Sequence, residues 1–158
     1  MNRVNKILEN KKYKEYLSKI NKCEKDRIFC RHTLQHFIDV SRMAYILSLE
    51  KNLSLEKEII YAVGLLHDIG RFMEYEENID HAVASAHLCV PILKDSFFSQ
   101  NEIDLITQAI GSHRNKDLLK SDLDFIIYEA DKKSRLCIDC KSLKECKKFK
   151  NTLPKLTY

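Results

Sequence analysis

The sequence predicts an all-α protein, and three observations lead to that expectation. Glycine and proline are scarce, with 3 and 2 of 158 residues, which disfavours a turn-rich β protein. Hydrophobic residues make up 44% and charged residues 32%, so the chain has enough apolar material for a core and lacks the composition of a disordered chain. The apolar residues also recur at helical spacing along most of the chain.

Charge, hydropathy and cysteine content indicate which partners and which cellular location to expect. The formal net charge of +4 is modest, and most of the excess lies in the last third of the chain, where few aromatic residues separate the lysines. We therefore do not expect nucleic acid as a partner. No apolar run is long enough to span a bilayer and no signal peptide is visible, so we expect a cytoplasmic protein without membrane association. Six cysteines are then more typical of thiols or metal ligands than of disulfides.

The first expected elements are an N-terminal helix and a helix that carries two histidines. Residues 4–20 have apolar residues at mixed helical spacing, which is typical of a peripheral amphipathic helix. From about Thr33 to Glu50, apolar residues mark one face of a second helix. His32 and His36 are one turn apart, so their imidazoles point to the same side.

The next helix is an apolar run that ends in His67 and Asp68. Ser54 can cap its start, and Gly70 is expected to end it. Burial of an imidazole and a carboxylate is costly unless both have partners. A divalent metal would satisfy both groups, so this pair indicates a metal site.

Three more helices are expected in the second half of the chain. A polar loop over residues 74–78 leads to a helix of small residues that begins at His81, and Pro91 is expected to end or bend that helix. Capping-box patterns then open two helices, one that leads to His113 and one that carries Asp131.

Four of these residues, from different helices or helix ends, form a candidate set of ligands: His36, His67, Asp68 and Asp131. Imidazole and carboxylate together suit Mn, Fe, Co, Ni or Zn better than Ca. The order and the local contexts resemble the HD-domain superfamily of metal-dependent phosphohydrolases. The contexts are His36-Phe-Ile-Asp-Val, Leu-Leu-His67-Asp68-Ile-Gly-Arg and Ala-Asp131-Lys-Lys-Ser.

This resemblance covers about residues 32–135, and it implies a bundle of five or more helices with those four residues around one ion. Some members of the superfamily hold a second ion through two further histidines. His81 and His113 are similar to those positions, and Asp68 would then bridge the two ions. The alternative is a one-metal site in which the two histidines bind phosphate or water.

A short lysine-rich extension over about residues 136–158 follows the HD-like core, and we expect one domain over residues 1–158. The extension carries a CxxC pair and a third cysteine. We expect these thiols and one upstream cysteine to form a second, structural metal site, with zinc as the first choice and an iron–sulfur cluster as the second. Free or oxidised thiols are the alternative. The four candidate ligands are Cys30, Cys137, Cys140 and Cys146.

The expected function is that of a metal-dependent phosphohydrolase acting on a nucleotide or another small phosphorylated compound. His67 and Asp68 would form the catalytic centre, because a bound divalent ion activates water and holds a phosphoryl oxygen. Neighbouring basic residues and one histidine are the candidates for substrate binding: Arg71, Arg114, Lys132, Arg135 and His32. His32 could instead donate a hydrogen bond to one of the metal ligands without binding the metal or the substrate. Two alternatives are a di-iron HD-type oxygenase and a non-catalytic HD module that binds a nucleotide.

Overall fold

The structure is a computed structural model that describes residues 1–149, 152–156 and 158. These residues form α-helices and short 3₁₀ helices without any strand, which confirms the all-α prediction. The α-helices are α1 (Asn2–Glu9), α2 (Lys11–Cys23), α3 (Leu34–Glu50), α4 (Lys57–Leu66), α5 (Arg71–Glu77), α6 (His81–Asp95), α7 (Gln100–Ser112) and α8 (Asp122–Lys133). The 3₁₀ helices are η1 (Lys116–Leu118), η2 (Cys137–Asp139) and η3 (Lys147–Phe149). No helix in the described part of the chain is long and apolar enough to cross a membrane.

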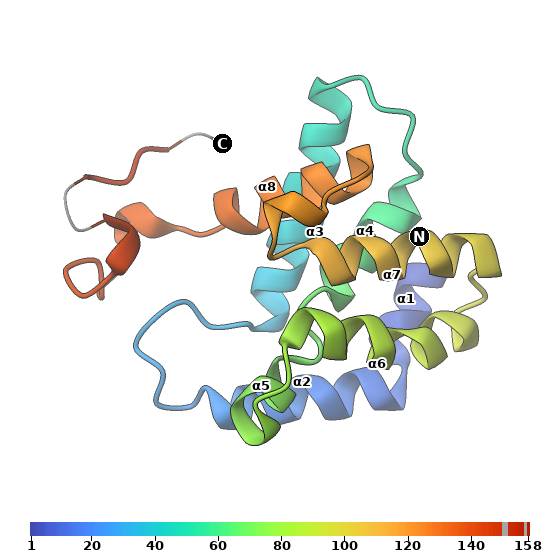
Figure 1. The fold of residues 1–158 in the computed structure, drawn as a ribbon, viewed down its shortest axis with the longest axis horizontal. Coiled ribbons are helices and arrows are strands. Elements are labelled where there is room, and N and C mark those ends of the chain that lie inside the picture. The colour runs from blue at the N-terminus through green and yellow to red at the C-terminus, as the bar shows by residue number, and fades with distance from the viewer. Residues whose placement is uncertain (150–151, 157) are drawn as a thin grey trace.

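The helices pack around one cluster of buried apolar side chains. Helix α3 packs against α4 and α8, and α6 packs against α7. In Figure 1, α2, α5 and α6 lie on the lower side of the bundle, while α3, α4 and α8 lie on the upper side. Gly64 of α4 permits a close approach to α3, because a Cβ there would lie 2.8 Å from the Cα of Ser41.

The N-terminal segment differs from the single peripheral helix predicted over residues 4–20. Asn10 has an extended backbone with ψ of 132°, and this breaks the segment into α1 and α2. The side chain of Asn10 caps α2 by accepting hydrogen bonds from the backbone N–H groups of Lys12 and Tyr13. Both helices are amphipathic, as predicted: Val4 and Ile7 of α1 and Tyr13 and Ile20 of α2 are buried, whereas the other residues of these helices are exposed or half-buried.

Both predicted limits of α4 are wrong. Ser54 does not cap the helix, because the chain stays extended through Glu56, where ψ is 129°. Leu53 and Leu55, on either side of Ser54, pack against the core and hold this extended segment in place. At the other end, α4 stops at Leu66, and residues 67–70 form a turn that leads directly into α5.

Gly70 allows that turn to approach α6. Its φ of −89° is open to any residue, so the need for glycine comes from space. A Cβ at this position would lie 2.5 Å from the backbone nitrogen of Ser85 and 2.8 Å from the Cβ of Ala84. The Gly70 N–H donates a hydrogen bond to Ser85 Oγ at 2.9 Å. The turn is therefore fixed against α6.

Other predicted elements have mixed outcomes. The loop expected over residues 74–78 is helical as far as Glu77, in α5. Pro91 does not end α6, which continues to Asp95. The capping boxes that open α7 and α8 are both present, as predicted.

The chain after α8 leaves the bundle and runs beside the loop that leads into α3, to the left in Figure 1. It forms η2, η3 and turns. Ser142 Oγ donates a hydrogen bond to the backbone oxygen of Ile28 at 2.6 Å, which joins the extension to that loop.

Candidate metal centre

The ends of several helices bring the predicted histidines and aspartates together. His36 lies in the first turn of α3, His67 and Asp68 follow α4, and Asp131 lies in the last turn of α8. His81 begins α6, and His113 follows α7. Potential ligand atoms within each of two groups all lie within 4.8 Å of one another. The first group is His36, His67, Asp68 and Asp131, and the second is Asp68, His81 and His113.

Asp68 belongs to both groups, and its two carboxylate oxygens face different imidazoles. Oδ1 lies 3.1 Å from His81 Nε2 and 3.5 Å from His113 Nε2. Oδ2 lies 3.3 Å from His67 Nε2 and 3.4 Å from His32 Nε2. One carboxylate could therefore contribute an oxygen to each of two adjacent ion sites.

Asp131 closes the first group. Its Oδ1 lies 3.3 Å from His36 Nε2 and 4.0 Å from His67 Nε2. Arg135, one helical turn later, donates from Nη2 to both oxygens of Asp131, at 2.7 and 3.0 Å. This contact orients the carboxylate toward the two imidazoles.

Hydrogen bonds at the opposite ring nitrogen orient two of the imidazoles. His67 Nδ1 donates to the backbone oxygen of Gly64 at 2.8 Å, and His113 Nδ1 donates to that of Ile110 at 2.6 Å. Because Nδ1 carries the proton in these bonds, the lone pair of a neutral ring is at Nε2, on the side of Asp68, where one cation could bind both groups. Metal-binding histidines are typically held in this way.

Two glutamates that the sequence reading missed hold two more imidazoles. His32 Nδ1 is hydrogen-bonded to Glu24, and His81 Nδ1 is hydrogen-bonded to Glu74. Glu24 precedes no motif, so nothing in the sequence points to it. Glu74 lies in a segment predicted as loop, and only its place one turn after Arg71 could have suggested a role.

The carboxylates are ionised despite their burial. Burial opposes ionisation of Asp68, but His67 and His113 outweigh it and hold the pKa of Asp68 well below its ordinary value of 3.8. Burial also opposes ionisation of Asp131, whereas the imidazole of His36, with Nε2 3.3 Å from Oδ1, helps to hold the pKa of Asp131 below 3.8. Both groups can therefore offer charged oxygens to a cation.

Burial lowers the pKa of two imidazoles, His36 and His81, and the pKa of His81 falls from 6.5 to about 4. Neutral imidazoles are the form that binds metals. Burial also acts to lower the pKa of His67, but Asp68 outweighs it and the pKa of His67 rises. The carboxylates thus attract positive charge, which a divalent cation would supply in place of a proton.

The donor atoms fit a divalent transition metal. His36 Nε2, His67 Nε2 and Asp68 Oδ1 are buried and have no hydrogen-bond partner in the described part of the chain. Buried polar atoms are rarely left without partners, because desolvation is costly. A metal ion between these nitrogen and oxygen donors would satisfy all three.

A cavity of about 260 Å³ opens beside the two groups, and every side chain that lines it is ionisable. The lining residues are Arg27, His32, Asp68, Arg71, His81, His113, Arg114, Asp131, Lys132 and Arg135. All five predicted substrate-binding residues are therefore present at this cavity. Arg27 is an addition that the sequence reading missed, because it lies in a loop far from the recognised motifs.

Several of the basic residues already have acidic partners. Arg71 Nη1 donates to Glu74 at 2.6 Å, and Arg114 Nη1 donates to Asp80 at 2.6 Å. Lys132, by contrast, donates to the backbone oxygen of Tyr128 at 3.4 Å.

The four cysteines of the predicted second site line another cavity, of about 280 Å³. Within the described ranges, no group of three potential ligand atoms closer than 4.8 Å to one another includes a cysteine. The thiols are thus neighbours around one space, and the structure does not hold them at coordination distances.

Comparisons with known proteins agree with this geometry. The family model of the HD domain matches residues 33–136. A crystal structure described as a predicted HD superfamily hydrolase, from an uncultured Thermotogales bacterium, is similar with a TM-score of 0.59 and 25% identity. The match covers 76% of this chain and 66% of that one.

Relatives by sequence include an uncharacterized protein of Clostridium beijerinckii, 44% identical over 146 residues and 92% of each chain. Ribonuclease Y of Desulfotalea psychrophila is 33% identical over 64% of this chain, and ribonuclease Y of Mycoplasma mycoides is 28% identical over 74%. The matched parts are only 18% and 21% of those two relatives. The match to the HD model over most of the helical bundle shows that this chain belongs to the HD domain family.

Proposed function

We propose that this protein is a metal-dependent phosphohydrolase that acts on a nucleotide or another small phosphorylated compound in the cytoplasm. The observation that carries the proposal is the position of Asp68. Its carboxylate lies between two groups of imidazoles, at the wall of a cavity that five basic side chains also line. Paired metal sites beside basic residues suit the transfer of a phosphoryl group to water.

We further propose two divalent transition ions, of Mn, Fe, Co, Ni or Zn, with one in each ligand group and Asp68 between them. Such ions polarise a phosphoryl oxygen and lower the pKa of bound water. The ionised carboxylate of Asp68 would orient the attacking water and accept a hydrogen bond from it. His67 would keep its lone pair directed at the same point through the hydrogen bond with Gly64.

The phosphate would be bound by the basic residues of the cavity. Lys132 has no carboxylate within 4.0 Å among the described residues, and its ammonium lies over the ring of Tyr128. Binding of phosphate would require this ammonium to turn from the ring toward the cavity. Arg71 is held by Glu74 and presents the rest of its guanidinium to the cavity. Arg114 is more exposed, and phosphate would have to compete with Asp80 for it.

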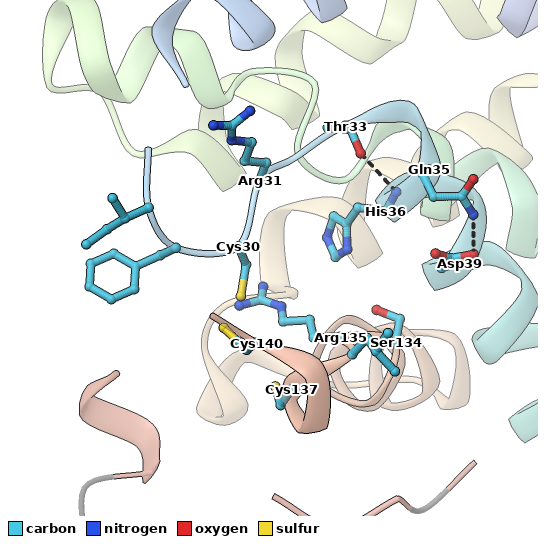
Figure 2. A pocket seen from close by; sticks show the side chains of 13 residues that line it. Cys30, Arg31, Thr33, Gln35, His36, Asp39, Ser134, Arg135, Cys137 and Cys140 are labelled. Atoms are coloured by element: carbon cyan, nitrogen blue, oxygen red, sulfur yellow. Dashed lines mark hydrogen bonds between the residues drawn. The ribbon is translucent and has the colours of Figure 1, made fainter. Parts of the chain in front are cut away.

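The organic part of the substrate would lie in a neighbouring cavity of about 310 Å³. This cavity shares Arg135 with the phosphate cavity and reaches the ligand His36 (Figure 2). Ile28, Phe29 and Leu136 give it the apolar surface that the phosphate cavity lacks. An ionic cavity beside a partly apolar one suits a phosphorylated compound with an organic group, such as a nucleotide.

A phosphate-release screen tests the proposal. Metal-free protein would be reconstituted with Mn, Fe, Co, Ni or Zn and assayed with mononucleotides, dinucleoside polyphosphates and sugar phosphates. We expect release with at least one metal, and we expect Asp68→Ala to lose both bound metal and hydrolysis. Asp104→Ala, which removes an exposed carboxylate of α7, is the matched control and should behave as wild type. Full activity of metal-depleted Asp68→Ala would contradict the proposal.

A second candidate substrate is RNA, which the names of the two ribonuclease Y relatives favour. The screen therefore includes a short oligoribonucleotide, and its cleavage without release from mononucleotides would select this candidate. Oxygen uptake by the iron form without phosphate release would select a di-iron oxygenase instead. Nucleotide binding without turnover under every metal would indicate a non-catalytic module.

A further inference from the structure

We infer that a structural zinc ion joins the loop before α3 to the C-terminal extension through four cysteines. The proposed ligands are Cys30, Cys137, Cys140 and Cys146. All four lie outside residues 33–136, the part of the chain that matches the HD domain. The proposed zinc site is thus an addition to the HD domain, and the inference does not rest on the proposed hydrolysis.

The two segments that carry these cysteines meet around one cavity. All four cysteines line it, and each is partly buried. Figure 2 shows the sulfur of Cys30 directed toward Cys140, with the guanidinium of Arg135 beside it. The hydrogen bond from Ser142 Oγ to Ile28 O, at 2.6 Å, holds the segments together next to the thiols.

The spacing of the cysteines suits zinc. Cys137 and Cys140 form a CxxC pair, and the Cys140 N–H donates to the Cys137 oxygen at 3.3 Å, so the pair forms a tight turn. Cys146 follows a second turn, and Cys30 supplies the fourth thiol from the other segment. Four thiols from two short segments are a usual ligand set for structural zinc. Coordination would draw the sulfurs inward across the cavity, which exposed loops can accommodate.

The charge around the cavity is complementary to such a site. Zinc bound by four thiolates carries a net negative charge. Basic side chains line the cavity with a single carboxylate, that of Glu145. The basic residues are Arg27, Arg135, Lys147 and Lys148. They would offset the charge of the thiolates and favour their deprotonation.

The extension buries little apolar surface over residues 134–149. No residue from 134 to 149 is fully buried, so this segment contributes little to the apolar core. Short segments without a core are commonly held by a metal or a cross-link, because apolar burial does not offset the loss of chain entropy. Zinc would supply that link.

The proposed zinc site lies next to the HD ligands. Arg135 lines the cysteine cavity and also donates a hydrogen bond to each carboxylate oxygen of Asp131. Cys30 is two residues before His32, which faces Asp68. Zinc would therefore fix the segments that carry Arg135 and His32 without contacting the proposed metal ligands of the HD domain.

Zinc analysis of the full chain, purified without oxygen, tests the inference. We expect about one zinc ion per chain that a thiol-modifying reagent releases. Cys140→Ser should lose this ion. Cys23→Ser is the matched control, because Cys23 is exposed and outside the cavity, and it should retain the ion. His67→Ala should also retain it, which separates this site from the HD ligands even if the protein proves not to be a phosphohydrolase.

Cobalt substitution of the wild-type chain provides a test that does not depend on the folding of a variant. Cobalt held by four thiolates absorbs strongly in the visible range and shows a sulfur-to-metal charge-transfer band, and we expect both. Wild-type protein with no thiol-releasable zinc would overturn the inference, as would a folded Cys140→Ser variant that retains it. Iron with acid-labile sulfide in place of zinc would also overturn it, in favour of an iron–sulfur cluster.

Discussion

Asp68 has two oxygens, and the imidazoles around it divide between them. His81 and His113 face Oδ1, whereas His67 and His32 face Oδ2. A carboxylate can serve two ions in this way only if the neighbouring imidazoles keep their Nε2 lone pairs directed at the same ions. The hydrogen bonds on the far side of each ring therefore matter as much as the ligands themselves.

Glu74 provides a test of this orientation at the residue scale. Glu74→Ala removes the acceptor of His81 Nδ1 and leaves Arg71 Nη1, 2.5 Å from that nitrogen, as its neighbour. Because Arg71 can only donate, the proton of a neutral His81 would move to Nε2, the nitrogen that faces Asp68. We expect about 10- to 100-fold weaker metal binding at the group of Asp68, His81 and His113. Metal titration followed by calorimetry would measure this affinity. We expect the affinity of the group that contains His36 to stay unchanged.

Two other variants complete that experiment. Glu74→Gln keeps an acceptor oxygen and should restore most of the affinity. Glu77→Ala removes an exposed carboxylate from the same helix and should leave both affinities unchanged. Wild-type affinity in Glu74→Ala would show that the hydrogen bond does not position His81.

At the scale of elements, the turn over residues 67–70 depends on its contact with α6. The turn carries His67 and Asp68, and α6 carries His81. The distance between the turn and α6 therefore fixes the spacing between the two ligand groups. Gly70 permits the contact because a side chain would collide with backbone atoms of α6. Backbone cannot move aside as a flexible side chain can.

Gly70→Ala should therefore lower the free energy of unfolding, by about 1–3 kcal/mol as in other overpacked sites. It should also weaken metal binding, because the turn must move away from α6. Urea denaturation and metal titration would measure the two effects. Gly111→Ala is the control: among the described residues its Cβ would meet only Ala86, at 3.9 Å, and alanine favours the helix. Equal stability of Gly70→Ala and wild type would show that the contact is not tight.

At the scale of the whole molecule, one arginine joins three helices that are far apart in the sequence. Arg3 of α1 forms ion pairs with Glu56 and Glu58 at the start of α4 and with Glu102 in the first turn of α7. Its guanidinium also lies over the ring of Phe98, 4.3 Å from the centroid. The N-terminal segment is thereby fixed to the bundle.

This network should make stability depend on pH. Hydrogen bonds from the Met1 ammonium and from Arg3 lower the pKa of Glu58 from 4.5 to about 2. The contribution to stability is therefore complete above the unfolded-state pKa and is lost as the pH falls toward 2. Arg3→Ala should be less stable than wild type at neutral pH, and the difference should shrink in acid.

Urea denaturation of both proteins from neutral pH down to about pH 3 would measure that difference. Arg42→Ala is the control, because Arg42 is exposed and its nearest carboxylate oxygen, on Asp39, is 3.8 Å away. A difference between Arg3→Ala and wild type that stays constant with pH would show that Glu58 does not depend on Arg3.

The sequence by itself determined the all-α class and the family, because both depend on local patterns. Helical spacing and capping boxes act within a few residues, and the His-Asp motif is contiguous. The same local patterns gave wrong helix boundaries at two places. At Asn10 a side-chain cap starts a new helix, and at Ser54 the packing of the flanking leucines keeps the chain out of the helix. The extent of the domain and the ligand roles stay predictions.

Only the tertiary structure decided how the candidate site is assembled. It brought Glu24 to His32, divided the two oxygens of Asp68 between imidazoles, and placed Cys30 beside the extension. None of these contacts follows from spacing along the chain, because each joins residues from separate elements. Their distances depend on how closely the helices pack, and that packing is a property of the whole core.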